Sequence, residues 1–453
     1  MSQAGISALL SLTAIVAVVG LLKVLRDQTA DWNISATFIF VMGWLYGLPA
    51  AFSSFAGGKV RSFSPVRDPI SILSSSTIQL THICNYLLLA VSLLTILVRA
   101  SRLQRLNAPA VVATLLCTAS GLVAAANNFG ILSKSSATLA AALIAVAFLP
   151  AGRGACLGAA AFVLSLASLS GFLTIVNYSL ATAPCAGLYK CGALGVFIFG
   201  VADNENGLAL ILASGVVFVW LSIRDRRWRT GLFCYVLGMI GISGSRTSAI
   251  AAVLLLVALS LSRHALHAAA APISPRHRQI TILGLSAAVL GAAVTGALLP
   301  FLTSDPVAFT YRGNVWLIAR ERLVGHYGIG LSQPGWASLV DNGVVGTYAG
   351  YSVHNQWLDV LWISGAFGMV LFILMLILLC RRDAVMGLVL LLPMAVLGIT
   401  ERAWSIAHFD DYSFAYLASL IAIPAIVRTV SETAPHWPDQ VRTSKGAAAL
   451  TSA

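Results

Sequence analysis

Long apolar runs, separated by short polar segments, fill most of the sequence. A transmembrane α-helix needs about 20 such residues. Thirteen runs approach or reach this length, and because several are short, a count of twelve fits equally well. They cover residues 5–25, 33–52, 78–98, 110–126, 137–150, 155–176, 207–223, 231–242, 248–261, 280–302, 355–380, 384–400 and 412–427. No segment alternates as the strands of a membrane β-barrel do. The pattern predicts an all-α polytopic integral membrane protein with 12 to 13 transmembrane helices.

The polar breaks divide the chain into six segments. These are N-terminal helices in 1–176, a loop in 177–206, helices in 207–302, a large loop in 303–353, C-terminal helices in 354–428 and a tail in 429–453. The large loop is long for a connection in a compact fold, and such loops are often functional. No segment outside the apolar runs is long enough for a soluble domain with its own core. We therefore expect chemistry in the two loops, where short helices can form, and at the helix ends beside them.

Composition and charge narrow the class of protein further. The chain is 58% hydrophobic and 10% charged, whereas soluble proteins carry about 25% charged residues. This excludes a water-soluble enzyme, a disordered chain and a coiled coil. The net charge of +12 resembles that of nucleic-acid binders. However, the loops after the odd-numbered runs hold 18 basic and 6 acidic residues, and the remaining loops hold 10 of each.

The basic loops therefore account for the whole excess charge. Lys and Arg gather in cytoplasmic loops of membrane proteins. This orientation predicts a cytoplasmic C-terminus and places residues 177–206 and 303–353 outside. It also argues against a nucleic-acid partner. Cys185 and Cys191 share the first of these outer loops, where a disulfide fits an oxidising periplasm, although two free thiols remain an alternative. The other cysteines fall in or beside apolar runs and are expected to be small buried hydrophobic residues; they are Cys84, Cys117, Cys156, Cys234 and Cys380.

A Gly-Ile-Ser-Gly-Ser-Arg-Thr-Ser segment at 241–248 links two apolar runs at the outer face. It places Arg246 at the membrane surface. A charged residue costs about 2.5–3.5 kcal/mol at the centre of the bilayer and less near its surface. Arg246 could anchor a helix end by extending its charge into water. The small residues around it, Ser245 among them, let a ligand approach closely, and this favours a binding site.

Residues 311–323 read as an amphipathic helix in the large loop, with Arg312 and Trp316 on one face. Arg320 and Arg322 are expected on a solvated face. A cation is disfavoured at a helix start by the helix dipole. An anion held jointly by Arg312 and the helix N-terminus would resolve this conflict.

His354 and Asn355 open the eleventh apolar run at the outer face. A neutral imidazole is a general base near neutral pH. A histidine that only caps a helix is the plainer interpretation, but the two arginines expected at the same face favour a catalytic one. The sequence has no Walker A motif and no zinc-ligand spacing, so we expect neither cofactor nor metal. The outer carboxylates at 203–205 and 410–411 are expected to be solvated or paired with arginine.

The ordered set of motifs resembles the O-antigen ligase and polymerase superfamily over about residues 204–427. Asn206, which opens a run after the first outer loop, resembles an asparagine of that family. The residues that carry the resemblance are Ser245-Arg246, Arg312 with Trp316, the Gly328-Ile-Gly330 turn, and His354-Asn355 followed by Leu358, Leu361 and Gly365. The N-terminal half resembles the family only as a stack of apolar helices.

The resemblance implies a GT-C-like glycosyltransferase. O-antigen ligases move a polysaccharide from undecaprenyl diphosphate to a sugar of lipid A–core at the periplasmic face of the Gram-negative inner membrane. O-antigen polymerases and protein O-oligosaccharyltransferases are the alternatives within the superfamily. Polymerases often carry a second Arg-rich outer loop, whereas residues 177–206 hold only Lys190, which favours a ligase. A more remote alternative is a transporter of lipid-linked glycans, but we find no repeat of the kind that transporters carry.

The expected mechanism needs no metal. Arg246 and Arg312 would stabilise the diphosphate leaving group through charge-assisted hydrogen bonds. His354 would take the proton of the acceptor hydroxyl. A single displacement inverts the anomeric carbon. Asn355 or Tyr311 would orient His354 or a sugar hydroxyl, with Ser245 and Asn206 in supporting positions.

Overall fold

The apolar runs form helices in the computed structural model, which describes residues 2–56, 59–64, 67–101, 106–129, 133–185, 191–202, 204–266, 275–345, 352–381 and 383–432. The elements are α1 (Gln3–Asp27), η1 (Thr29–Asp31), α2 (Ile34–Phe55), β1 (Lys59–Ser64), β2 (Arg67–Leu73), α3 (Ser75–Ala100), α4 (Ala108–Ala126), α5 (Lys134–Phe148), α6 (Arg153–Val176), α7 (Tyr178–Ala181), β3 (Thr182–Pro184), β4 (Val196–Ile198), α8 (Glu205–Ser222), α9 (Arg226–Ser243), α10 (Arg246–Leu266), α11 (Pro275–Leu302), α12 (Ala308–Leu323), α13 (Gln333–Asp341), α14 (Gln356–Cys380), α15 (Ala384–Leu397) and α16 (Ser413–Glu432).

Seven helices in the described ranges are long and apolar enough to cross a membrane. They are α1, α2, α3, α4, α6, α11 and α14. Five shorter apolar helices, α5, α8, α10, α15 and α16, accompany them. The chain is therefore mostly helical, and these helices are compatible with the predicted membrane protein. The helix α16 extends to Glu432, beyond the expected start of the tail, and residues 433–453 lie outside the described residues.

Two small antiparallel sheets, which the sequence analysis did not predict, accompany the helices. One is the hairpin β1–β2 and the other pairs β3 with β4. The hairpin lies in the connection from α2 to α3, where polar residues alternate with Val60, Ile70 and Ile72. Such alternation of polar and β-branched residues is a strand signal, but it is too short to stand out beside the long apolar runs.

Polar residues at the ends of the apolar runs cap the helices. Ser74 begins α3, Ser133 begins α5, Asp225 begins α9 and Asp383 begins α15, and each side chain accepts a hydrogen bond from a backbone N–H of the first turn. Helix starts leave several N–H groups without partners inside the helix, and these side chains satisfy some of them. The caps explain why α3, α5 and α9 begin three to five residues before their apolar runs.

The helix α6 is the centre of the N-terminal half. It packs against α1, α2, α8 and α16. Its sequence is rich in Ala, Gly and Ser, and most of its side chains are buried. A Cβ atom at Gly158 would collide with the carbonyl oxygen of Ala36, so glycine lets the backbones of α6 and α2 touch. Small residues serve this purpose widely in membrane helix bundles.

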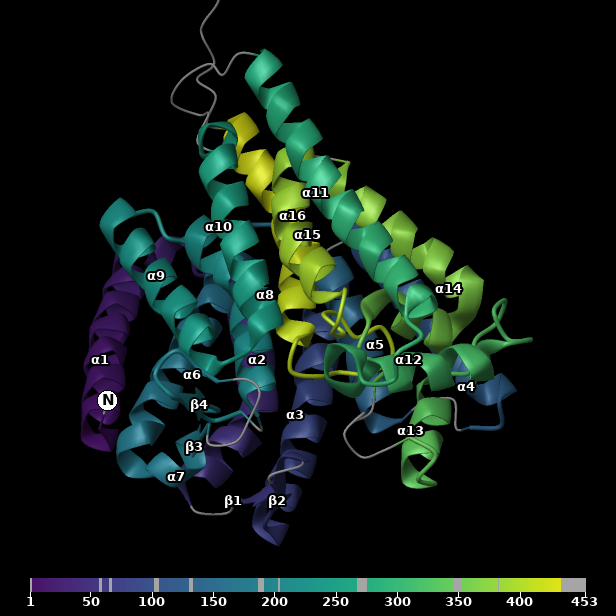
Figure 1. Ribbon diagram of the computed structural model, residues 1–453. Helices are drawn as coiled ribbons and strands as arrows, with labels where there is room; N and C mark the ends of the chain where they lie inside the picture. The colour runs from purple at the N-terminus through teal and green to yellow at the C-terminus, as the bar shows by residue number, and fades with distance from the viewer. Residues whose placement is uncertain are drawn as a thin grey trace, which may run out of the picture.

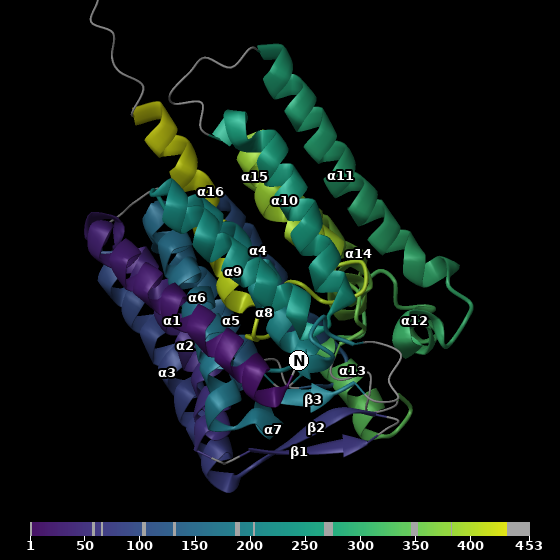
Figure 2. The same cartoon turned by 60° about the vertical axis from the view of Figure 1, so that its left-hand side comes forward.

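The C-terminal half is built around α14 and α15. The helix α15 packs against α10 and α11, and α14 packs against α4 and α15. Figures 1 and 2 show α7, the strands, α12 and α13 gathered at one end of the helices, while the far ends of α10, α11 and α16 lie at the other. We call the first of these the loop end. The starts of α10 and α14 belong to it, because both helices run away from it.

The cysteines divide largely as the sequence indicates. Cys185 and Cys191 form a disulfide with their Cα atoms 5.4 Å apart, at the loop end. Cys84, Cys117 and Cys156 are buried. Cys234, however, is exposed on α9, so the expectation that it is buried is wrong.

Candidate functional site

The carboxylate of Glu401 joins His354 to Arg312 at the loop end. Its Oε1 accepts a hydrogen bond from Nη2 of Arg312, and its Oε2 lies 3.1 Å from Nδ1 of His354. Glu401 follows α15, Arg312 belongs to α12, and His354 precedes α14. The side chains are 8%, 17% and 24% exposed, respectively. The structure therefore brings two sequence-predicted residues together through a third that the sequence analysis did not single out.

Arg312 stands at the start of the regular part of α12. The three residues before it, Phe309, Thr310 and Tyr311, have left-handed backbone angles with φ between 52° and 66°. The Nη1 of Arg312 donates to the carbonyl oxygen of Phe309 at 3.2 Å. An arginine at a helix start was expected to need an anion, and the carboxylate of Glu401 is that anion in this structure.

Trp316, one turn after Arg312, fixes the same helix to the backbone beside His354. Its indole Nε1 donates to the carbonyl oxygen of Val353 at 3.0 Å, and its side chain is fully buried. Ala319 and Leu323 are also buried. The predicted shared face of this helix is therefore the one that packs inward.

His354 has a left-handed backbone, with φ of 50°. A non-glycine residue in this region costs about 1–3 kcal/mol, which the surrounding contacts must offset. Val353 on one side is held by Trp316, and Asn355 on the other side caps α14. With this backbone conformation the imidazole of His354 contacts Glu401, while the next residue, Asn355, caps α14.

Asn355 anchors the site and does not contact His354. Its Oδ1 accepts from the N–H of Leu358 at 2.8 Å, and its Nδ2 donates to the carbonyl oxygens of Gly296 and Ile399, each at 2.8 Å. The sequence analysis predicts that Asn355 or Tyr311 orients His354 or a sugar hydroxyl. In this structure the Asn355 amide binds the backbone of its own helix and of two other segments. Glu401 makes the contact with the imidazole instead.

Gln356 completes a run of three residues that bind the connection between α15 and α16. Its Oε1 accepts from the N–H groups of Ala403 and Trp404 at 2.9 and 2.7 Å, and its Nε2 donates to the carbonyl oxygen of Trp404 at 3.0 Å. The side chain is fully buried. With His354 on Glu401 and Asn355 on Ile399, three consecutive side chains fix this connection against the start of α14.

Arg246 is the first residue of α10 and belongs to the same end of the molecule. Gly244, with φ of 98°, ends α9, and the chain re-enters a helix two residues later. The next residue, Thr247, lies with its Oγ1 3.1 Å from the Oγ1 of Thr400. Arg246 therefore adjoins the contact between α10 and the residue that precedes Glu401.

The three supporting residues predicted from the sequence take different positions. Ser245 is buried, and its hydroxyl donates to Ser248 at 3.0 Å, within the turn that presents Arg246. Tyr311 is exposed and directly precedes Arg312. Asn206 lies in the first turn of α8, a helix that packs against α10.

A second buried ion pair, between Arg402 and Asp410, lies beside the first. Their side chains are 2.9 Å apart, and Asp410 also accepts from the hydroxyl of Ser413. Burial opposes the charge of Arg402, but the carboxylates of Asp410 and Asp359 outweigh it and hold the pKa of Arg402 above its ordinary value. Burial, followed by the charge of Arg402, holds the pKa of His408 well below its ordinary value, so this imidazole is neutral.

The carboxylates at 203–205 and 410–411 have different surroundings. Asp410 pairs with arginine, as expected. Asp203 and the side chain of Glu205 lie outside the described residues. Within the ranges that the structure describes, no three His, Cys, Asp or Glu side chains are grouped to hold a metal ion.

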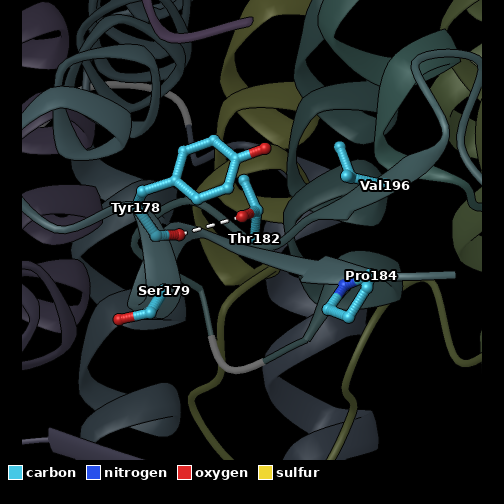
Figure 3. A pocket seen from close by; sticks show the side chains of 5 residues that line it. All are labelled: Tyr178, Ser179, Thr182, Pro184 and Val196. Carbon is cyan, nitrogen blue, oxygen red and sulfur yellow. Dashed lines mark hydrogen bonds between the residues drawn. The ribbon is translucent and has the colours of Figure 1, made fainter. Parts of the chain in front are cut away.

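A hollow of about 370 Å³ lies elsewhere at the loop end (Figure 3). It is lined by Tyr178, Ser179, Thr182, Pro184 and Val196. The hydroxyl of Thr182 donates to the carbonyl oxygen of Tyr178 at 2.9 Å. The hollow is formed by α7, β3 and β4 and contains none of the residues around Glu401, so we assign it no part in the site.

A Glu-Arg pair directly after an apolar run was the available signal for Glu401 and Arg402. Charged residues at the edge of a membrane span are costly and often functional. The chemistry available here is that of one imidazole base beside guanidinium groups able to bind an anion.

No protein-family model, no curated protein and no solved structure matches this chain.

Proposed function

We propose that this chain is a membrane glycosyltransferase of the O-antigen ligase type. It would transfer O-antigen polysaccharide from undecaprenyl diphosphate to a sugar hydroxyl of lipid A–core, completing lipopolysaccharide. The proposal rests on the contacts of His354 and Arg312 with the same carboxylate, that of Glu401. The helix start that contains Arg246 lies beside them. One group suits proton removal and the others suit the diphosphate, and all lie at one end of an apolar helix bundle.

The diphosphate would bind to Arg246 and Arg312. Breaking the bond from the anomeric carbon to a diphosphate oxygen places negative charge on the leaving group. Forked guanidinium groups stabilise that charge with charge-assisted hydrogen bonds. The Nε of Arg312 makes no hydrogen bond with the described residues but is buried, so a phosphate oxygen would reach it only after the side chains around it moved. Two arginines supply the positive charge that a divalent metal provides in other phosphate chemistry.

His354 would act as the general base. It would take the proton of the acceptor hydroxyl as that oxygen attacks the anomeric carbon. With a single displacement the anomeric configuration inverts. We therefore propose a metal-independent, inverting reaction in which His354 and the arginines flank the reacting carbon.

The topology would place this chemistry at the periplasmic face of the Gram-negative inner membrane. Seven long and five shorter apolar helices support a bundle of 12 or 13 spans, and the GT-C-like arrangement is what the sequence resemblance implies. The excess of Lys and Arg in the opposite loops supports a cytoplasmic C-terminus. The donor lipid would enter between helices, and the acyl chains of the acceptor would stay in the outer half of the membrane.

The test is transfer by the purified protein in lipid nanodiscs. Lipid-linked O-antigen and lipid A–core are incubated with it, and product size and released undecaprenyl diphosphate are measured. One transfer onto the core supports a ligase. Chain growth on the lipid carrier identifies a polymerase, transfer only to protein identifies an oligosaccharyltransferase, and movement of the donor without its consumption identifies a transporter.

The matched variants are His354→Ala and His326→Ala. His326 is an exposed histidine of the same loop segment. The first variant should lose at least about 10²-fold of the rate, as expected for removal of a general base, while the second should keep it. Equal activity in the two variants would refute the role of His354.

A further inference from the structure

We propose that Glu401 is the positioning residue of this reaction, which fixes the tautomer of His354 and ties the base to the leaving-group arginine. The inference rests on the function proposed above. Glu401 touches neither reacting carbon nor acceptor in this scheme. It acts through its two oxygens, one on Nδ1 of His354 and the other on Arg312.

The contact at Nδ1 determines which ring nitrogen is the base. An ionised carboxylate accepts hydrogen bonds but cannot donate one. A neutral imidazole that binds Glu401 at 3.1 Å through Nδ1 must therefore carry its proton there. This leaves the lone pair of Nε2 to accept a proton, in the manner of other histidine bases that a carboxylate orients.

The step balances without a further reactant. The acceptor oxygen forms its bond to the anomeric carbon and gives its proton to Nε2 of His354. The bond from that carbon to the diphosphate oxygen breaks, and its electron pair leaves with the diphosphate. The resulting imidazolium then bonds to Glu401 through Nδ1, and its extra proton passes to solvent after product release.

The second contact links proton removal to donor binding. In this structure Arg312 offsets the charge of Glu401. Diphosphate on Arg312 would draw guanidinium charge towards the phosphate oxygens, so more of the carboxylate charge would remain to stabilise the imidazolium. The base would then be strongest when the donor is bound.

The backbone around Glu401 is fixed as a positioning role requires. The N–H of Glu401 donates to the carbonyl oxygen of Leu397 at 2.9 Å. Asn355 and Gln356 bind the residues on either side of it, Ile399 and Ala403. A group held by several such bonds loses little entropy when the reaction begins.

The other charges near His354 do not replace this contact. Arg312 shares Glu401 with it. Asp359 is buried one turn into α14, and its charge and that of Arg402 also act on this region. In the described part of the chain, Glu401 supplies the only charged side chain hydrogen-bonded to the imidazole.

The first test needs no substrate. Diethyl pyrocarbonate modifies unprotonated imidazole, and peptide mass spectrometry of the intact purified protein gives the rate at His354 from pH 5 to pH 8. In Glu401→Gln, the midpoint of that rate should move to lower pH, because the carboxylate that binds the ring through Nδ1 is gone. The rate at His326 in the same sample is the reference and should not move. An unmoved midpoint at His354 would overturn the proposal.

The second test is activity. Glu401→Gln should reduce kcat by about 10² or more, since the amide can donate to Nδ1 and move the proton to Nε2. Glu401→Asp keeps the charge and should recover part of the rate. Glu321→Gln, an exposed position on α12, is the control and should retain full activity.

The two tests separate this inference from the proposed function. A shifted midpoint in a protein that transfers no glycan would support Glu401 as the partner of His354 and would refute the proposed glycosyltransferase function. Full transfer activity of Glu401→Gln would refute the positioning role of Glu401 but would still support the proposed glycosyltransferase function. If Glu401→Gln does not fold, Glu401→Asp decides: a lowered kcat with an unmoved midpoint supports the role, and an unchanged kcat overturns it.

Discussion

The indole of Trp316 and the carbonyl oxygen of Val353 share a buried hydrogen bond of 3.0 Å that joins α12 to the residue before His354. Because Arg312 lies one turn before Trp316, this single bond sets the leaving-group arginine and the proposed base at a fixed separation. The strained backbone of His354 ends directly beside it. The bond therefore contributes to geometry as well as to stability.

Trp316→Phe should lower both stability and activity. The substitution leaves the buried carbonyl of Val353 without its partner, which costs about 1–3 kcal/mol, and frees His354 to leave its strained conformation. We expect a lower melting temperature in nanodiscs and a fall in kcat larger than any change in the donor KM.

Trp220→Phe is the matched control for that variant. The indole N–H of Trp220 is buried without a hydrogen bond to the described residues, so this change removes ring area and weakens the contact of the ring with Arg229 but breaks no such hydrogen bond. Equal losses in the two variants would show that the Trp316 bond has no special role.

Substitution of the two arginines by lysine should test the need for a forked donor. Arg312→Lys and Arg246→Lys keep the charge but lose the planar guanidinium that binds two phosphate oxygens at once. We expect each to reduce kcat/KM for the lipid-linked donor by about 10-fold or more, and Arg312→Lys to weaken the contact with Glu401 as well.

Arg322→Lys is the control for both, because Arg322 is exposed on the outer side of α12. It should leave donor kinetics unchanged. Full activity of both lysine variants at the site would contradict diphosphate binding by a guanidinium fork, although it would leave a simple charge effect.

Much of the fold is predictable because the length of an apolar run is a local property of the sequence. His354, Arg312 and Arg246 were identifiable for a similar reason, since each is a polar residue at an unusual place along its own segment. The runs at 231–242 and 248–261 are shorter than the helices α9 and α10, because the polar first turn of α9 and the polar ends of α10 lie outside the apolar pattern.

Glu401 was not identifiable in this way. It is 89 residues from Arg312 and 47 from His354, and its importance arises only when three segments fold together. The backbone contacts of Asn355 were not identifiable for the same reason. A polar residue beside a candidate base can contact the base or substrate, or it can bind backbone groups. Only the positions of Gly296 and Ile399 in the fold reveal that this amide binds backbone.

Asn355→Ala should act mainly on stability. It removes the cap of α14, worth about 0.5–2 kcal/mol, and leaves two carbonyl groups without their donor. We expect a marked drop in melting temperature, with activity falling as the connection that carries Glu401 loosens. Asn342→Ala, at an exposed helix end, should change neither. A stable but inactive Asn355→Ala would instead favour direct action on the substrate.

Chelation should leave the reaction unchanged. The proposed mechanism assigns the leaving-group charge to Arg246 and Arg312 and the proton to His354, and guanidinium groups need no metal to bind diphosphate. The purified protein is treated with EDTA, dialysed, and assayed for release of undecaprenyl diphosphate with and without added Mg²⁺. We expect equal rates in all samples. A rate lost with EDTA and restored by Mg²⁺ would mean that a cation supplies part of the charge that we assign to the arginines. Arg312→Ala would then be expected to respond more strongly to added Mg²⁺ than the unsubstituted protein, because the metal would carry more of the leaving-group charge.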